Sequence, residues 1–223
     1  MTYSLPILGV LLSFVFVFIA KPKHKENFKL LLAFSGAFLL ALTIFELFPS
    51  VYENSDAKTI GIFVLLGILL QIFLEFFSKG AEHGHVHLDK EKSSFPWLLF
   101  FSLSVHAFLE GFPIEKHDTI IYGILIHKIP FAIILSIFLL ESEVKLANAV
   151  FFILLFSLMT PLGSYVAANF EFATDYYAPI TALVIGVFLH ISTVILFESS
   201  EGHKFNLRKL VVITVGIVIA YFL

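Results

Sequence analysis

The sequence has no cysteine, one tryptophan and few charged residues. Without cysteine the chain cannot form a disulfide or a thiolate metal site, so nitrogen and oxygen atoms would have to hold any metal. Charged residues make up 14% and apolar residues 59% of the chain, whereas a soluble domain has about 25% and about 45–50%. This composition excludes a soluble enzyme, a disordered tail and a collagenous repeat. A net charge of −3 without a long basic block also excludes a nucleic-acid binder.

Long apolar runs fill most of the 223 residues, and short polar connections separate them. In a bilayer the backbone polar groups must bond within their own segment, so each run is expected to be a helix. The alternating segments of about 10 residues that build membrane β-barrels do not occur in the sequence. We therefore predict an all-α polytopic membrane protein, with residues 1–223 forming a single transmembrane domain of eight helices. The predicted spans are 4–20, 28–50, 59–78, 95–112, 118–140, 145–168, 177–198 and 206–223, and residues 79–94 form a histidine-containing loop.

Positive residues are distributed unevenly between the connections. Eleven of the fourteen lysines and arginines fall in odd-numbered connections, two in even-numbered ones, and Lys128 lies inside the fifth span. Cytoplasmic connections carry the excess of positive residues in membrane proteins. The odd connections are therefore predicted to be cytoplasmic, and an even number of spans then places both termini outside the cytoplasm. We expect a multi-pass protein of the cell membrane.

Ionisable residues inside predicted spans are costly and are therefore functional candidates. His106 and Glu110 in the fourth span are four residues apart, so their side chains share one helix face. His127 lies in the fifth span, which runs back across the membrane. At about 1.5 Å per residue the two histidines lie about 9 and 14 Å below the outer ends of their spans. They can therefore meet near the middle of the membrane if these helices are neighbours.

Two imidazoles and one carboxylate suit zinc or another late divalent ion. The alternative is that His106 and Glu110 only hydrogen-bond to each other inside the helix bundle. The sequence leaves the ion open, because Fe²⁺, Mn²⁺, Co²⁺ and Cd²⁺ also accept histidine and carboxylate ligands.

The motifs around these residues resemble those of the ZIP (Zrt-, Irt-like protein) family of divalent metal transporters. The segment from His106 to Gly111 is similar to that family's fourth-helix His-Asn/Ser-x-x-Glu-Gly motif, and His127-Lys128-Ile129-Pro130 is similar to its fifth-helix motif. Weaker similarities are found at 46–49, 160–163 and 186–190.

The resemblance implies a transporter and not an enzyme, with zinc (Zn²⁺) as substrate. It also implies uptake toward the cytoplasm by alternating access, a movable bundle of spans one, four, five and six, and a homodimer. Family members often bind a second ion, but the second site here has lost most of its oxygen ligands and gained an ammonium, because the corresponding positions are Ala107, Lys128, Phe131 and Thr160. An ammonium about 4 Å from an ion pathway would repel a second cation. We therefore expect one metal site, formed by His106, Glu110 and His127, with Lys128 as the cation substitute in the second.

Other polar residues have two interpretations each. His83, His85 and His87 form an alternating pattern typical of a metal-binding loop, but they also fit a solvated linker. Glu46, near the outer end of span two, either attracts cations or is a solvated helix-end acid. His190 either lines the pathway or hydrogen-bonds to Thr193 on its own helix, and Glu75 is expected to extend toward the membrane surface.

Two other functions remain open at this point. One is an intramembrane zinc-dependent hydrolase of the ceramidase kind, in which histidines would hold a metal that activates water. Such an enzyme needs more convergent histidine, aspartate and serine residues than the sequence offers. The other is a ZIP-like protein that binds metal without transporting it, a possibility that Lys128 leaves open.

Overall fold

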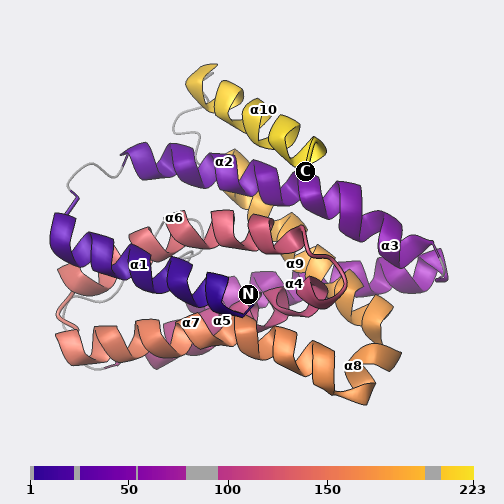
Figure 1. The fold of residues 1–223 in the computed structure, drawn as a ribbon, viewed down its shortest axis with the longest axis horizontal. Helices are drawn as coiled ribbons and strands as arrows, with labels where there is room; N and C mark the ends of the chain where they lie inside the picture. The colour runs from indigo at the N-terminus through magenta and orange to yellow at the C-terminus, as the bar shows by residue number, and fades with distance from the viewer. Residues whose placement is uncertain (1–2, 23–25, 54, 79–94, 199–206) are drawn as a thin grey trace.

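The computed structural model describes residues 3–22, 26–53, 55–78, 95–198 and 207–223, and Figure 1 shows their arrangement. The regular elements in these ranges are all helices, so the predicted all-α class is confirmed. In chain order they are α1 (Ser4–Ala20), α2 (Glu26–Leu42), η1 (Thr43–Leu47), α3 (Phe48–Tyr52), α4 (Ala57–Ser78), α5 (Trp97–Glu110), η3 (Phe112–Glu115), α6 (Ile120–Glu141), α7 (Leu146–Asn169), α8 (Glu171–Asp175), α9 (Tyr177–Glu198) and α10 (Leu207–Tyr221).

Six helical segments are long and apolar enough to cross a membrane. They are 28–52, 57–78, 97–115, 120–141, 146–169 and 177–197. The first and last helices are shorter, with 17 residues in α1 and 15 in α10. All eight predicted spans contain a helix, but a count of eight membrane crossings stays a prediction.

The long helices form two packed groups. In one group α1, α6, α7 and α5 pack against each other, and an apolar cluster that includes Leu103, Phe131 and Phe152 fills its centre. In the other group α2, α4, α9 and α10 pack together, and α10 lies along the outer side of α2 (Figure 1). The two groups meet where α2 contacts α6 and α4 contacts α5. The site residues on α5 and α6 therefore belong to the first group.

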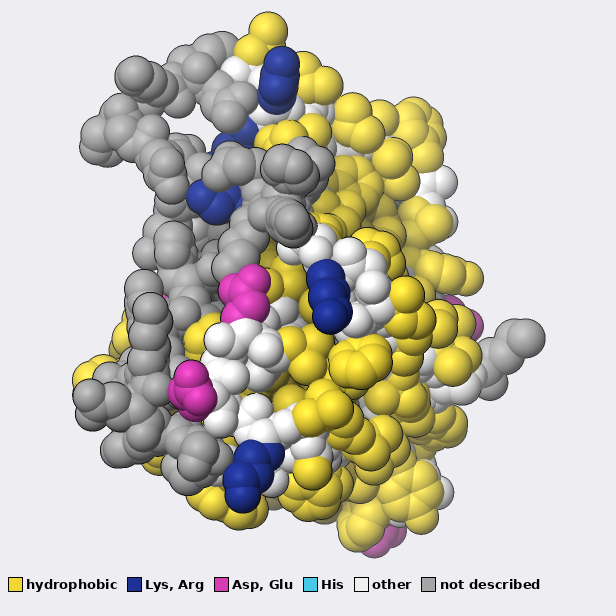
Figure 2. All heavy atoms as spheres, turned by 90° about the vertical axis from the view of Figure 1, so that its left-hand side faces the viewer, with side chains coloured by type: hydrophobic (Ala, Val, Ile, Leu, Met, Phe, Trp, Pro, Cys, Tyr) yellow, Lys and Arg dark blue, Asp and Glu magenta, His cyan; other side chains and the backbone are white. Residues whose placement is uncertain are grey.

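One end of the helix bundle carries a concentration of charge. Figure 2 looks onto this end, where basic and acidic side chains lie beside an apolar flank. The basic residues at or next to the helix ends here are Lys21, Lys29, Lys145, Arg208 and Lys209, and the acidic ones include Glu26, Glu141, Glu143 and Glu198. Lysine and arginine residues are thus more numerous here than at the other end, which has Lys58 and Lys116, and a cytoplasmic position for this end stays a prediction.

This orientation can be tested by labelling, because the native chain has no cysteine. Single cysteines at positions 56 and 116 should react with a membrane-impermeant maleimide added to intact cells. A cysteine at position 143 should react only after the membrane is opened. The reverse pattern would place both termini in the cytoplasm and contradict the charge distribution.

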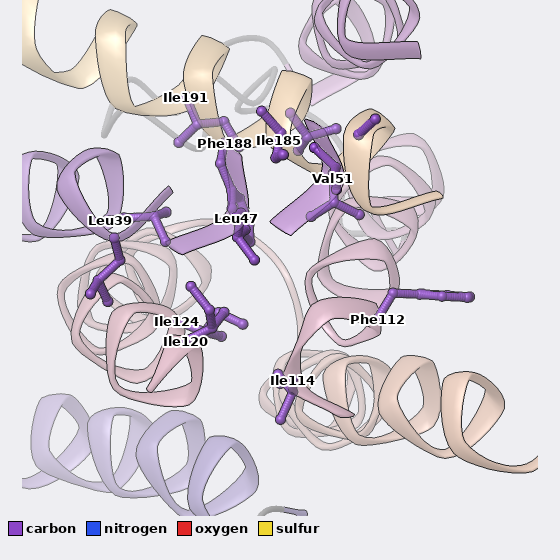
Figure 3. Packing of buried hydrophobic residues seen from close by; sticks show 14 of the residues in the cluster. Leu39, Leu47, Val51, Phe112, Ile114, Ile120, Ile124, Ile185, Phe188 and Ile191 are labelled. Carbon is purple, nitrogen blue, oxygen red and sulfur yellow. The ribbon is translucent and has the colours of Figure 1, made fainter. Parts of the chain in front are cut away.

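An apolar layer joins the two groups of helices. Figure 3 shows Leu47, from η1, between Phe188 of α9 and Ile120 and Ile124 of α6. These four side chains are 0% exposed. The layer therefore closes the contact between the two groups near the start of α6, before the metal-ligand candidate His127.

The π-helical turn η1 interrupts the second span between Thr43 and Leu47. Pro49 follows two residues later; it has no N–H, and its ring displaces the carbonyl four residues earlier. The chain accommodates this by a wider turn, in which the Phe48 N–H bonds to the Thr43 carbonyl. The turn contains Glu46, one of the predicted pathway residues.

Candidate metal centre

The three predicted ligands lie together in the structure. His106 and Glu110 come from one face of α5, and His127 comes from α6. One ligand atom from each lies within 4.8 Å of the other two. Among the described residues this is the group of histidine and acidic side chains with the geometry to hold a metal ion. All three side chains are at most 3% exposed, so the group is closed to both membrane surfaces.

The carboxylate of Glu110 is shared between two partners. Its Oε1 lies 2.8 Å from Nε2 of His106, and its Oε2 accepts a hydrogen bond of 2.6 Å from Nζ of Lys128. The rings of His106 and His127 face each other edge-on with centroids 6.5 Å apart. Nδ1 of His106 is buried without a hydrogen-bond partner among the described groups. The two carboxylate oxygens therefore point to different sides of the site.

Lys128 lies on the side of the site that faces Oε2 of Glu110. Its side chain is 1% exposed, and its ammonium lies 4.9 Å from the centre of the Phe156 ring. Thr160 closes the same side, where its hydroxyl donates to the Ala107 carbonyl at 2.9 Å and lies 3.5 Å from Glu110 Oε2. The Lys128 ammonium is thus a fixed positive charge of the protein, buried and paired with the Glu110 carboxylate.

The ligand atoms must move closer together to bind an ion. Zinc binds nitrogen and oxygen at about 2.0–2.2 Å in tetrahedral geometry, so its ligand atoms lie about 3.4 Å apart. The spread of 4.8 Å in this group is larger. His106 Nε2 and Glu110 Oε1 are already close, at 2.8 Å. To complete a three-ligand site, His127 must approach from α6, and His106 Nε2 and Glu110 Oε1 must separate slightly.

Two comparisons with known proteins place this arrangement in a family. The model of the ZIP zinc transporter family matches residues 82–223, which is more than half of the chain. This chain belongs to the ZIP family. It is also similar to the zinc transporter ZIP1 of zebrafish (Danio rerio), with 39% identity over 93 residues, which cover 38% of this chain and 30% of that protein. The match thus spans less than one third of the relative's length.

The structure gives a physical role to the glycines in two of the ZIP-like motifs. Gly111 follows Glu110 at the end of α5, and Gly163 lies in α7. A Cβ atom on Gly163 would lie 1.9 Å from the Phe108 carbonyl oxygen, and one on Gly111 would lie 2.2 Å from the Thr160 carbonyl oxygen. The two backbones therefore touch at this crossing, and this contact brings Thr160 against the site.

Replacing Gly163 with alanine should disrupt this crossing. The added methyl group would clash with the backbone of α5, so α5 and α7 must separate. Overpacking of this kind lowers the free energy of unfolding by about 1–3 kcal/mol or more. We expect a lower thermal unfolding midpoint in detergent and weaker zinc binding. The matched control is Gly61→Ala in α4, where the nearest heavy atom to the new Cβ is Oη of Tyr52 at 3.9 Å. Equal stability of the two variants would show that the crossing is not tight.

The ZIP chain has a polar cluster between the site and its predicted outer surface. The hydroxyl of Thr119, before α6, donates to Oε2 of Glu46 in η1. His117 lies nearby, and burial lowers its pKa, although the negative charge of Glu46 raises it in part. Glu46 therefore links the second group of helices to the start of α6. Sequence reasoning missed His117, which lies in a short connection without a recognisable motif.

A second polar pair lies toward the opposite end. Nε2 of His190 on α9 lies 2.7 Å from Oε2 of Glu75 on α4, and both side chains are partly exposed. The hydroxyl of Thr193 donates to the backbone carbonyls of Leu189 and His190 and does not explain the position of the imidazole. Glu75, expected to extend toward the membrane surface, turns instead to His190. The predicted loop histidines His83, His85 and His87 lie outside the described residues.

Proposed function

We propose that this ZIP protein carries a divalent metal ion, with zinc as the main substrate, into the cytoplasm. The single observation that carries the proposal is the buried group of His106, Glu110 and His127 inside the first helical group. An ion held there is shielded from both surfaces. A movement of the first group, which carries the site, against the second group would expose the ion to one side at a time, which is transport by alternating access with no covalent step.

One ion occupies the site at a time. Glu110 offers Oε1 on the side of the two histidines, while its Oε2 is bound by Lys128. The first side has two nitrogen donors and one oxygen donor, which suit zinc. The second side has Ala107, the Lys128 ammonium, Phe131 and Thr160, and only Thr160 among their side chains has an oxygen. Lys128 thus takes the electrostatic place of a second cation.

Glu46 and His190 mark the two ends of the proposed pathway. Glu46 faces the outer end of α6 together with Thr119, where an acidic group attracts cations. His190 and Glu75 lie nearer the cytoplasmic ends of α9 and α4, where an ion leaving the site would meet another nitrogen and oxygen pair. The loop with His83, His85 and His87 would then offer the ion a weak cytoplasmic binding site. The protein acts as a homodimer in the cell membrane, with both termini outside.

A second candidate is a ZIP-like protein that binds zinc without moving it. The close pair between Lys128 and Glu110 favours this reading, because the ammonium competes with the metal for the same carboxylate. The hydrolase alternative has no comparable support, because the described residues hold no additional histidine or acid at the metal group and ZIP family members are transporters.

Uptake of radioactive zinc by proteoliposomes containing the purified chain separates these candidates. A transporter accumulates zinc with time inside the vesicles, whereas a binding protein shows only a rapid stoichiometric signal. Competition by unlabelled Fe²⁺, Mn²⁺, Co²⁺ and Cd²⁺ ranks the substrates. Binding without time-dependent uptake would contradict the transport proposal.

A further inference from the structure

The connection between η3 and α6, residues 116–119, contacts the second group of helices at two points. The hydroxyl of Thr119 donates to Oε2 of Glu46 in η1, the turn that continues α2. Nζ of Lys116 lies 3.8 Å from the centre of the Tyr177 ring, at the start of α9. The connection is therefore attached to two separate elements of that group.

The same connection joins the two helices that carry the metal-ligand candidates. Glu110 ends α5 shortly before it, and His127 lies in α6 shortly after it. Ile120, the first residue of α6, is 0% exposed and belongs to the apolar layer shown in Figure 3. A movement of the first group against the second at this end therefore has to break both contacts and open the layer.

His117 lies within the connection and is half-buried. Burial lowers the pKa of its imidazole, Glu46 opposes this in part, and Lys116 adds to it, so that the pKa lies below its ordinary value. The chain neighbours Glu115 and Asp118 are exposed, and α7, which packs against η3, has no charged residue. The closed connection thus favours the neutral imidazole, whereas a histidine in water takes up a proton near pH 6.5.

We propose that the 116–119 connection is a gate that closes the metal site on its predicted outer side, and that protonation of His117 opens it. The contacts with Glu46 and Tyr177 hold the gate closed at neutral pH. Since the closed state keeps His117 neutral, the open state binds the proton first as the pH falls below about 6.5, and the equilibrium moves toward opening. Above this pH the imidazole is neutral in both states, and the gate does not respond. The inference rests on the proposed function only in that the ion enters from this side.

Labelling of single cysteines in the apolar layer measures the opening of the gate without a transport assay. Ile120→Cys and Val51→Cys place reporters on α6 and α3, at positions that are at most 1% exposed, in a chain without native cysteine. The full-length protein is purified in detergent with a zinc chelator. Its rate of reaction with a maleimide is divided by that of Asp56→Cys, an exposed position, so that the pH dependence of the reagent cancels.

Removing either contact should open the gate at neutral pH. In both reporter proteins Thr119→Val should raise the labelling rate at least about tenfold, because it removes a hydrogen bond to a charged group. Lys116→Met should raise it about threefold, as expected for a cation–π contact at an exposed lysine. The matched controls are Thr214→Val in α10, whose hydroxyl bonds within its own helix, and Lys58→Met, an exposed lysine at the same end as the gate. Both controls should leave labelling unchanged.

Acid should open the gate through His117. At about pH 5.5 the labelling of the reporter proteins should rise severalfold, with about tenfold as the limit one pH unit below the ordinary pKa. His117→Gln should abolish this rise. Equal labelling of Thr119→Val and the controls would overturn the gate, and an acid response that persists in His117→Gln would overturn the role of the imidazole. Thermal unfolding midpoints identify any reporter that disturbs the fold, in which case the other reporter decides. Since labelling is measured without zinc, a failed gate leaves the transport proposal standing, and absent zinc uptake leaves the gate standing.

Discussion

Zinc uptake should fall at least about 100-fold when His106 or His127 is replaced by alanine. Even the loss of a residue that only hydrogen-bonds to a metal ligand lowers metal affinity or activity about 10–100-fold. In the proposed site each side chain provides one of three donors, and because the site is buried water cannot easily replace it. Glu110→Gln should have a similar effect, because the amide keeps the shape of the side chain but loses its charge. The measurement is the initial rate of radioactive zinc uptake in proteoliposomes, together with equilibrium zinc binding.

Ser104→Ala is the matched control for these ligand variants. Ser104 lies on α5 two residues before His106, and its buried hydroxyl has no hydrogen-bond partner among the described groups. Its removal should therefore leave uptake close to that of the unmodified protein. All variants are compared for yield and thermal unfolding, so that loss of ligand and loss of fold are separated. Normal uptake by a stable His106→Ala protein would exclude the proposed site.

Replacing Lys128 with glutamate should convert a one-ion site into a two-ion site. The introduced carboxylate would lie beside Glu110, so two negative charges would repel each other in a buried environment. Removing one partner of a buried ion pair costs about 3–5 kcal/mol, and the repulsion adds to this cost. We expect this variant to be strongly destabilised in chelator and restored by zinc. Titration or anomalous scattering should then count two ions per chain.

Lys128→Met separates the loss of the ammonium from the gain of a ligand. This variant leaves the Glu110 carboxylate without its cation but adds no oxygen donor, so it should bind one ion, and more tightly than the unmodified protein. Two ions in the unmodified protein would contradict the single-site proposal. So would a Lys128→Glu protein that remains stable in chelator and binds one ion.

The helical fold and the proposed ligand set could be predicted from the sequence because both depend on local physics. An apolar run in a bilayer must bond its own backbone, so helix type follows from composition. The spacing of four between His106 and Glu110 places them on one face of any helix. The location of His127 followed from counting residues down from the membrane surface, and the structure brings the three side chains together.

Contacts between residues far apart in the sequence could be identified only from the tertiary structure. The pairing of Glu75 with His190 joins residues 115 positions apart, and its geometry depends on how α4 packs on α9. Similarly, Glu46 contacts Thr119 because Glu46 lies in the π-helical turn before Pro49. The hydrophobic pattern of the sequence does not reveal how this turn changes the direction of the side chain.

The sequence by itself determined the helices, the direction of the charge asymmetry and the residue types available to bind a metal. Only the tertiary structure decided that Glu110 divides its two oxygens between His106 and Lys128. It also decided that the glycine crossing of α5 and α7 brings Thr160 against this carboxylate. The physical reason is that helix formation depends on neighbours in the chain, whereas the orientation of a buried carboxylate depends on every charge and backbone packed around it.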